Sequence, residues 1–204
     1  MKTLFFDIDG TLHKEDILFN FIVFLYRKHW LKTLLCLPLI LLGIILWKLG
    51  NNSNLGVNML YFIACFGLNE KGYRQAVAEF AQHFKATYTP FAQVQAKLNH
   101  SDRIFLISGS PVELIQAVYP NLTQQPNVRL IGSISQAKWG SRYISERCYA
   151  EHKRVMLDRE YPNTQFDEGY SDSLKDLPIL ALCKQAFRVD KRGDIQPLTT
   201  DDKG

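Results

Sequence analysis

The segment that most constrains the fold runs from Phe5 to Leu12 and reads F-F-D-I-D-G-T-L. Its apolar run ends on two carboxylates, Asp7 and Asp9, and Gly10 and Thr11 follow at once. This order predicts a buried strand that delivers both carboxylates to a glycine turn. In open α/β sheets, ligands bind at the carboxyl ends of the strands. An acidic pair there can hold a hard cation and supply a nucleophile beside a general acid/base, although an ordinary strand-to-turn junction has a similar composition.

Three later segments form an ordered set with the first. The apolar run 103–108 (R-I-F-L-I-S) ends on a serine, and Gly109 follows it. Lys153 precedes an apolar helical face, and Y-S-D-S-L-K-D-L supplies Asp172 and Asp176. Together the four segments resemble the motifs of the haloacid dehalogenase superfamily of phosphotransferases, in its phosphoserine-phosphatase-like branch. The resemblance implies an α/β fold: a Rossmann-like parallel sheet flanked by helices, with an inserted, strongly apolar, all-helical cap.

The resemblance also implies a role for each motif residue in phosphoryl transfer. Asp7 would be the nucleophile that forms an aspartyl-phosphate, and Asp9 the general acid/base. Ser108 and the amide of Gly109 would bind the substrate phosphate. Lys153 would offset the negative charge of the nucleophile and the phosphoryl group, and would also contact that phosphate.

Mg²⁺ is the cofactor that the resemblance implies. Its ligands would be the Asp7 carboxylate, the Asp9 backbone carbonyl and Asp172, since Mg²⁺ keeps several waters and needs few protein oxygens. Asp176 would act through a water or by orienting Lys153, although it could instead cap the helix that follows.

The motif spacing predicts the domain organisation. Residues 1–14 and 100–192 form the expected catalytic core, and 15–99 form the helical cap, because so long a stretch between two core strands is too long for a loop. Residues 193–204 are expected to be a mobile tail.

Three apolar segments occupy the expected cap, at about 17–26, 33–47 and 55–68. The second shows no polar face, yet it is shorter than the ~20 residues that span a bilayer. Basic residues (Arg27, Lys28 and Lys32) and tryptophans flank it, which is typical of interfacial anchoring. We therefore expect membrane association through a hairpin. A buried cap helix or a dimer interface is the alternative.

After residue 103, strands and helices alternate, as in a parallel sheet wrapped by helices. Ser110 is expected to cap a helix that starts at Pro111. The other expected elements are strands at 128–133, 166–171 and 186–189, helices at 151–159 and 176–183, and irregular or hairpin structure at 137–148.

Composition narrows the partners and the compartment. The formal net charge is +4 and the pI is near 8.8, but no basic stripe with interleaved aromatic residues indicates nucleic acid. An anionic membrane surface fits the charge better, and no obligate protein partner is indicated. The four cysteines are scattered, without metal or redox spacing, which fits a reducing compartment. A cleaved leader would remove Asp7 and Asp9, so we expect these residues in the cytoplasm.

The substrate is indicated by a closer resemblance. Phrases along most of the chain resemble bacterial phosphatidylglycerophosphatases of the C type, which remove the terminal phosphate of phosphatidylglycerophosphate to give phosphatidylglycerol at the cytoplasmic face of the inner membrane. They include F-F-D-I-D-G-T-L-H, L-I-S-G-S-P, R-C-Y-A-E-H-K and G-Y-S-D-S. One alternative is a soluble phosphatase for a small phosphomonoester such as phosphoserine, with the apolar cap buried in a dimer. Another is a non-catalytic membrane-binding protein.

Overall fold

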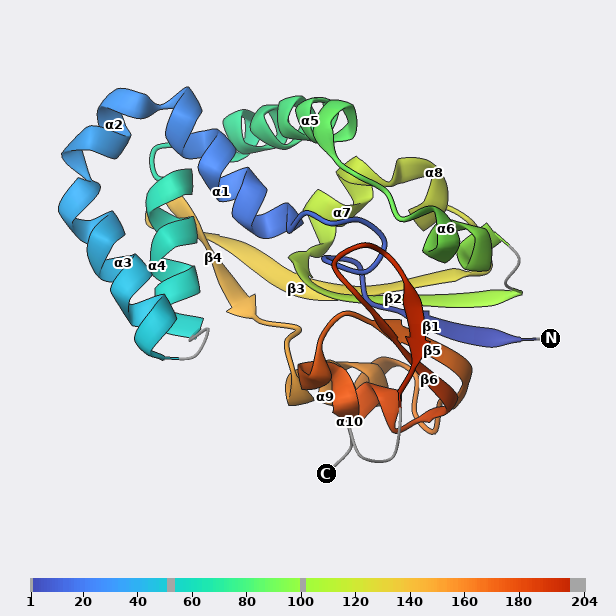
Figure 1. The fold of residues 1–204 in the computed structure, drawn as a ribbon. Helices are drawn as coiled ribbons and strands as arrows, with labels where there is room; N and C mark the ends of the chain where they lie inside the picture. Colours follow the sequence, from blue (N-terminus) through green and yellow to red (C-terminus); the bar gives the residue numbers. More distant parts are fainter. Residues whose placement is uncertain (1, 51–53, 100–101, 199–204) are drawn as a thin grey trace.

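The computed structural model describes residues 2–50, 54–99 and 102–198, which contain a seven-stranded sheet in the order β4-β3-β2-β1-β5-β6-β7 (Figure 1). The strands are β1 (Thr3–Phe6), β2 (Arg103–Pro111), β3 (Val128–Lys138), β4 (Ser141–Glu146), β5 (Phe166–Ser171), β6 (Cys183–Val189) and β7 (Ile195–Pro197). The central pairs are parallel, and β4 and β7 are antiparallel edges. The order reverses at β1, so the crevice between the ends of β2, β1 and β5 is where a ligand is expected.

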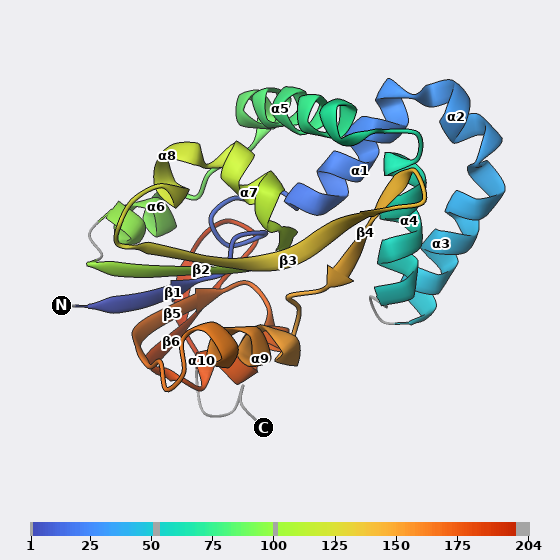
Figure 2. The same ribbon diagram turned by 180° about the vertical axis from the view of Figure 1, so that it is seen from behind.

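Helices cover both faces of this sheet (Figures 1 and 2). Between β1 and β2 lie α1 (Ile17–Lys28), α2 (Trp30–Leu35), α3 (Leu37–Leu49), α4 (Asn54–Cys65), α5 (Glu70–Thr87) and α6 (Ala92–Asn99). Later in the chain come α7 (Val112–Val118), α8 (Pro120–Thr123), α9 (Glu151–Glu160), the 3₁₀ turn η1 (Leu174–Asp176) and α10 (Leu177–Leu180). The prediction of an α/β fold with a mainly parallel sheet flanked by helices is confirmed.

Strand β1 shows why both faces need cover. Successive side chains of a strand point to opposite faces, and all of its later residues are apolar. Leu4 and Phe6 join a core with the inserted helices and α7, whereas Phe5 joins a second core with α9 and α10. A strand that is apolar on both faces is typical of the middle of a parallel sheet.

Helix α1 turns the chain away from the sheet and into the inserted helices. The Asp16 carboxylate accepts a hydrogen bond from the Phe19 N–H at 2.6 Å and so caps the helix. Ile17, Phe21 and Leu25 recur at helical spacing and are fully buried.

Helix α3 is exposed on most of its surface. Of its thirteen residues, only Ile40 and Gly43 are buried. Helices α3 and α4 nonetheless pack closely, because a Cβ at Gly56 would collide with the backbone of Trp47. Among the described residues, no helix is both long and apolar enough to cross a membrane.

A β-hairpin joins the inserted helices to the sheet (Figure 2). Strands β3 and β4 are linked by Trp139 and Gly140, both with positive φ (51° and 70°), as a tight hairpin turn requires. The side-chain amide of Asn58, in α4, hydrogen-bonds both backbone groups of Ile144 in β4. It accepts from the Ile144 N–H at 2.6 Å and donates to the Ile144 carbonyl at 3.1 Å. Of the irregular or hairpin structure expected at 137–148, the structure has the hairpin. The strand expected at 128–133 is longer, because hairpin pairing extends it to Lys138.

Three further expectations need correction. Ser110 does not cap a helix: β2 continues to Pro111 through an irregularity in its pairing with β3, and the next helix starts at Val112. The helix expected at 176–183 is a 3₁₀ turn followed by the short α10. Ile195–Pro197, in the expected mobile tail, forms β7 by pairing with β6, while 199–204 lie outside the described residues.

Candidate functional site

Asp7 lies directly after β1, at the carboxyl end of the sheet. Its N–H donates to the Tyr170 carbonyl at 2.9 Å, so the β1–β5 pairing fixes its backbone. The side chain is almost wholly buried. Burial raises the pKa of the Asp7 carboxyl; Lys153 opposes the rise, and the charges of Asp176, Asp172 and Asp9 add to it.

Lys153 is the cation that faces Asp7. Helix α9 brings its Nζ to 2.8 Å from Asp7 Oδ1 and 2.7 Å from Asp176 Oδ2. Burial alone would lower the pKa of Lys153, but these two carboxylates outweigh burial and raise it. The ammonium is therefore held charged between two buried acids, and Asp176 orients it.

Asp176 is itself positioned by β5. Ser171, the last residue of that strand, donates from its hydroxyl to Asp176 Oδ2 at 2.7 Å. Asp176 makes no side-chain cap to α10. The Asp176 side chain therefore contacts Lys153 and does not cap α10.

Asp9 accepts three hydrogen bonds. Ser108 Oγ and Ser110 Oγ donate to Oδ2 at 2.7 and 2.8 Å, and the Ile17 N–H donates to Oδ1 at 2.7 Å. The last of these ties the site to the first residue of α1. Ser108, predicted to bind phosphate, is thus fully buried with its hydroxyl on Asp9, whereas Gly109 and Ser110 line the adjoining cavity.

The turn after β1 is built against Asp172. Gly10 has φ +76°, and a Cβ there would lie 2.5 Å from Asp172 Oδ2. The Asp172 N–H donates to Thr11 Oγ1 at 2.9 Å, which holds β5 to this turn. Only glycine fits this backbone and this space.

The acidic groups fit a hard divalent cation. Burial raises the pKa of the Asp172 carboxyl to about 6, and the charge of Asp176 adds to the shift. Asp7, Asp9 and Asp172 line one cavity, together with Lys153. The described residues hold no cluster of three or more histidine, cysteine or acidic side chains with metal-site geometry. A site of two carboxylates, one carbonyl and waters needs no such cluster, so the donor set suits Mg²⁺.

The cavity extends from these charges to the inserted helices. Its volume is about 230 Å³. The apolar side chains that line it come from α1, α3 and α4: Leu18, Phe19, Ile22, Trp47, Val57 and Leu60. A cavity with a charged floor and an apolar wall can receive a phosphate ester that carries an apolar group.

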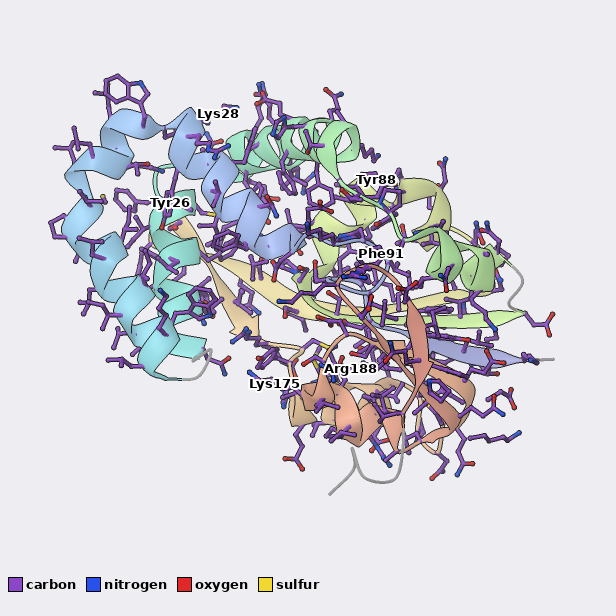
Figure 3. All side chains as sticks on the ribbon, in the orientation of Figure 1. Tyr26, Lys28, Tyr88, Phe91, Lys175 and Arg188 are labelled. Carbon is purple, nitrogen blue, oxygen red and sulfur yellow. The ribbon has the colours of Figure 1, made fainter. Side chains whose placement is uncertain are left out.

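Some of the residues in the site were not predicted from the sequence. Ser110 was expected as a helix cap but bonds to Asp9. Asp16, Arg147 and Tyr149 line the cavity, and so does Lys175, on the side of the core where α3 and α4 lie (Figure 3). The R-C-Y-A-E-H-K phrase was the signal for Arg147 and Tyr149, since it ends on Lys153.

Comparison with known proteins gives a family match and several structures of similar fold. Residues 4–181 match the family described as haloacid dehalogenase-like hydrolase. A Bordetella pertussis Tohama I protein of unknown function has a TM-score of 0.65 and 15% identity, over 91% of this chain and 89% of that one. A phosphoserine phosphohydrolase-like protein from Francisella tularensis gives 0.55 and 18% over 91% and 86%, and a substrate-bound phosphoserine phosphatase gives 0.51 and 13% over 91% and 84%. At these identities the structural likenesses show a shared fold.

Proposed function

The chain belongs to the haloacid dehalogenase-like hydrolase family, and from that membership we propose that it hydrolyses phosphomonoesters through an aspartyl-phosphate. The observation that carries the proposal is the buried Lys153 ammonium, 2.8 Å from Asp7 at the sheet's carboxyl end. The similarity in fold to a phosphoserine phosphatase supports it.

In the proposed first step, an Asp7 carboxylate oxygen attacks phosphorus and the bond from phosphorus to the ester oxygen breaks. Asp9 gives its proton to the leaving alkoxide. In the second step, Asp9 takes a proton from water as that water attacks phosphorus, which releases phosphate and restores Asp7. The hydrogen bonds from Ser110 Oγ and the Ile17 N–H to Asp9 fix the direction in which its carboxyl faces the ester.

The remaining charges offset the phosphoryl group. Lys153, held by Asp176, neutralises the nucleophile and the equatorial oxygens. Ser108 turns its hydroxyl from Asp9 to a phosphate oxygen, beside the Gly109 amide. Asp7, the Asp9 carbonyl and Asp172 would hold Mg²⁺, which supplies charge neutralisation on the phosphate oxygens.

The preferred substrate under this proposal is phosphatidylglycerophosphate, giving phosphatidylglycerol. The cavity supports a lipid, because its apolar lining includes Trp47 of α3. Helices α2 and α3 also carry leucine, isoleucine and tryptophan side chains that are 43–83% exposed: Trp30, Leu31, Leu34, Leu35, Leu37, Leu39, Leu41, Leu42, Ile45 and Leu49. Soluble monomers rarely expose so many large apolar side chains together.

We assign this exposed apolar surface of α2 and α3 to a membrane. It would rest in the interface of an anionic bilayer, at the cytoplasmic face of a bacterial inner membrane, with residues 1–14 and 100–192 forming the catalytic part in the cytoplasm. The basic flank contributes less than its sequence indicates: Lys28 pairs with Glu79, and Lys32 Nζ donates to the Ala64 and Phe66 carbonyls at 2.8 and 2.9 Å. The apolar side chains therefore carry the docking.

Phosphate release from phosphatidylglycerophosphate in detergent micelles tests the proposal, measured beside phosphoserine and glycerol 3-phosphate, with Mg²⁺ and with EDTA. We expect a strong preference for the lipid that disappears with EDTA. Equal or faster turnover of a small ester would leave the phosphatase reaction standing and reject the lipid. The exposed surface would then belong to a dimer, as in the soluble alternative.

A further inference from the structure

The wall of the cavity contains a basic group that the hydrolytic reaction does not use. Arg147 and Tyr149 lie between β4 and α9, and Lys175 lies in η1. The Arg147 guanidinium lies over the Tyr149 ring, 4.2 Å from its centroid. Lys175 Nζ is 5.3 Å from the same centroid and donates to the Tyr149 hydroxyl at 2.7 Å. Two cations thus share one aromatic ring.

Hydrogen bonds hold the segment with Arg147 and Tyr149 beside Gly109, whose amide is expected to bind phosphate. The Cys148 N–H donates to Ser133 Oγ at 3.0 Å, and Ser133 Oγ donates to the Gly109 carbonyl at 2.6 Å. A Cβ at Gly109 would lie 3.8 Å from Tyr149 Cδ2. The ring therefore lies beside Gly109, with room between them for no more than a methyl group.

The same group also reaches toward the apolar end. Arg147 Nη1 donates at 3.2 Å to the side chain of Asn54, the first residue of α4. One turn further on, Val57 of that helix lines the cavity. The basic group consequently lies between the carboxylates and the apolar wall.

We propose that Arg147, Tyr149 and Lys175 form a second anion site, which binds a phosphodiester situated between the phosphomonoester and the acyl chains of the substrate. This rests on the proposed function, since it names the substrate class of that same cavity. A guanidinium and an ammonium suit a singly charged phosphodiester, and the ring keeps both cations near one point. Lys153 cannot serve, because its Nζ is shared by Asp7 and Asp176.

Asp16 is the acid that opposes such binding. It lines the same cavity, and its charge acts on Arg147. Its Oδ1 caps α1 by accepting from Phe19. A phosphodiester must outcompete this carboxylate for Arg147, and Lys175, at the hydroxyl of the ring, supplies the added attraction.

The experiment compares two lipids in the same mixed micelles: phosphatidylglycerophosphate, which has a phosphodiester and a phosphomonoester, and phosphatidate of equal chain length, which has only the monoester. p-Nitrophenyl phosphate reports on the reaction without a lipid. The variants are Arg147→Gln, Lys175→Gln and Tyr149→Phe. Lys184→Gln is the matched control, since Lys184 pairs with Asp167 away from the cavity.

We expect Arg147→Gln and Lys175→Gln each to lower kcat/KM for phosphatidylglycerophosphate about 10-fold, mainly through KM, because the lost contact serves ground state and transition state alike. Tyr149→Phe should lower it about threefold. Turnover of phosphatidate and p-nitrophenyl phosphate should stay within about twofold, which also shows that the variants fold.

Equal losses on both lipids, or no loss on either, would overturn the second anion site. So would a wild-type enzyme that prefers phosphatidate, and in each of these cases the phosphatase proposal stands. If the wild type releases phosphate from none of the esters, the proposed function itself fails.

Discussion

Two regions of the molecule differ from the usual pattern of burial in opposite ways. The carboxyl end of the sheet buries charged side chains, and helices α2 and α3 expose apolar ones. At the sheet, Asp7, Lys153 and Asp176 are nearly inaccessible to solvent. On the helices, Leu35 and Leu49 are more than 80% exposed. Buried charge and exposed leucine each raise the free energy of the isolated fold. Each is relieved by something outside the chain, which under our proposal is a phosphate with its cation in one region and a bilayer in the other.

The largest expected effect is in the buried region. Asp7→Asn should lower turnover of every ester by a factor on the order of 10⁴ or more, because no nucleophile remains. Lys153 keeps Asp176 as its partner, so the melting temperature should stay within a few degrees. Steady-state kinetics and a thermal melt measure both, with Asp158→Asn as the control, since Asp158 pairs with Arg154. Retained turnover would remove Asp7 from the reaction.

The second prediction places negative charges on the exposed surface of α2 and α3. Leu35→Glu combined with Leu42→Glu should weaken binding to phosphatidylglycerol-containing vesicles by at least about 100-fold, because each leucine loses roughly 1.5–3 kcal/mol of burial. Turnover of p-nitrophenyl phosphate should not change. Val155→Glu places the same charge on an exposed apolar residue of α9 and should bind vesicles as the wild type does.

Sedimentation of the same proteins decides between the two partners for the exposed surface. A wild-type dimer that becomes a monomer in the double variant, with no vesicle binding by either, would make this surface a protein interface. The exposed leucines would then be covered by a second copy of the chain and not by a bilayer.

A smaller effect is expected where the helices pack on each other. Gly56→Ala should lower the free energy of unfolding by about 1–3 kcal/mol, because the new methyl group meets the Trp47 backbone and α3 must shift. Turnover of the small ester at 25 °C should hold, since the carboxylates are placed by the sheet. Urea unfolding and p-nitrophenyl phosphate turnover measure the two quantities. A parallel loss of both would show that the regions unfold together.

The smallest expected effect is a difference between the two regions in how fast their cysteine thiols react. Burial raises the pKa of the Cys65 thiol and of the Cys148 thiol to about 12, so at pH 8 only about one molecule in 10⁴ carries either thiolate. Cys36 and Cys183 are partly exposed and should react first with a disulfide reagent. Cys65 lies in α4 and should react before Cys148 if the inserted helices open locally.

Repeating this labelling experiment with micelles tests docking. Micelles should slow the reaction of the Cys36 thiol, in the inserted helices, and leave the reaction rate of the Cys183 thiol unchanged. Equal slowing of both thiols would contradict docking through α2 and α3.

The motif residues could be placed from the sequence because local pattern suffices for them. A continuous apolar run, followed by Asp and Gly, predicts the end of β1, and the ends of neighbouring parallel strands meet. Ser110 could not be placed, because its contact with Asp9 depends on an irregularity in β2 pairing. Arg147 and Tyr149 depend on the hydrogen bonds from Cys148 through Ser133 to Gly109, which join segments far apart in sequence.

The β3–β4 hairpin affects how substrate enters the cavity and how product leaves it. The inserted helices connect to the sheet through the chain before α1 and the chain after α6, and the hairpin adds a third attachment at Asn58. An arm held at three places cannot swing as a lid about a single hinge. We therefore expect the cavity, which Trp47 and Arg147 line, to stay open through the cycle. Under our proposal, lipids would enter and leave by sliding along α3, and turnover should be insensitive to solvent viscosity.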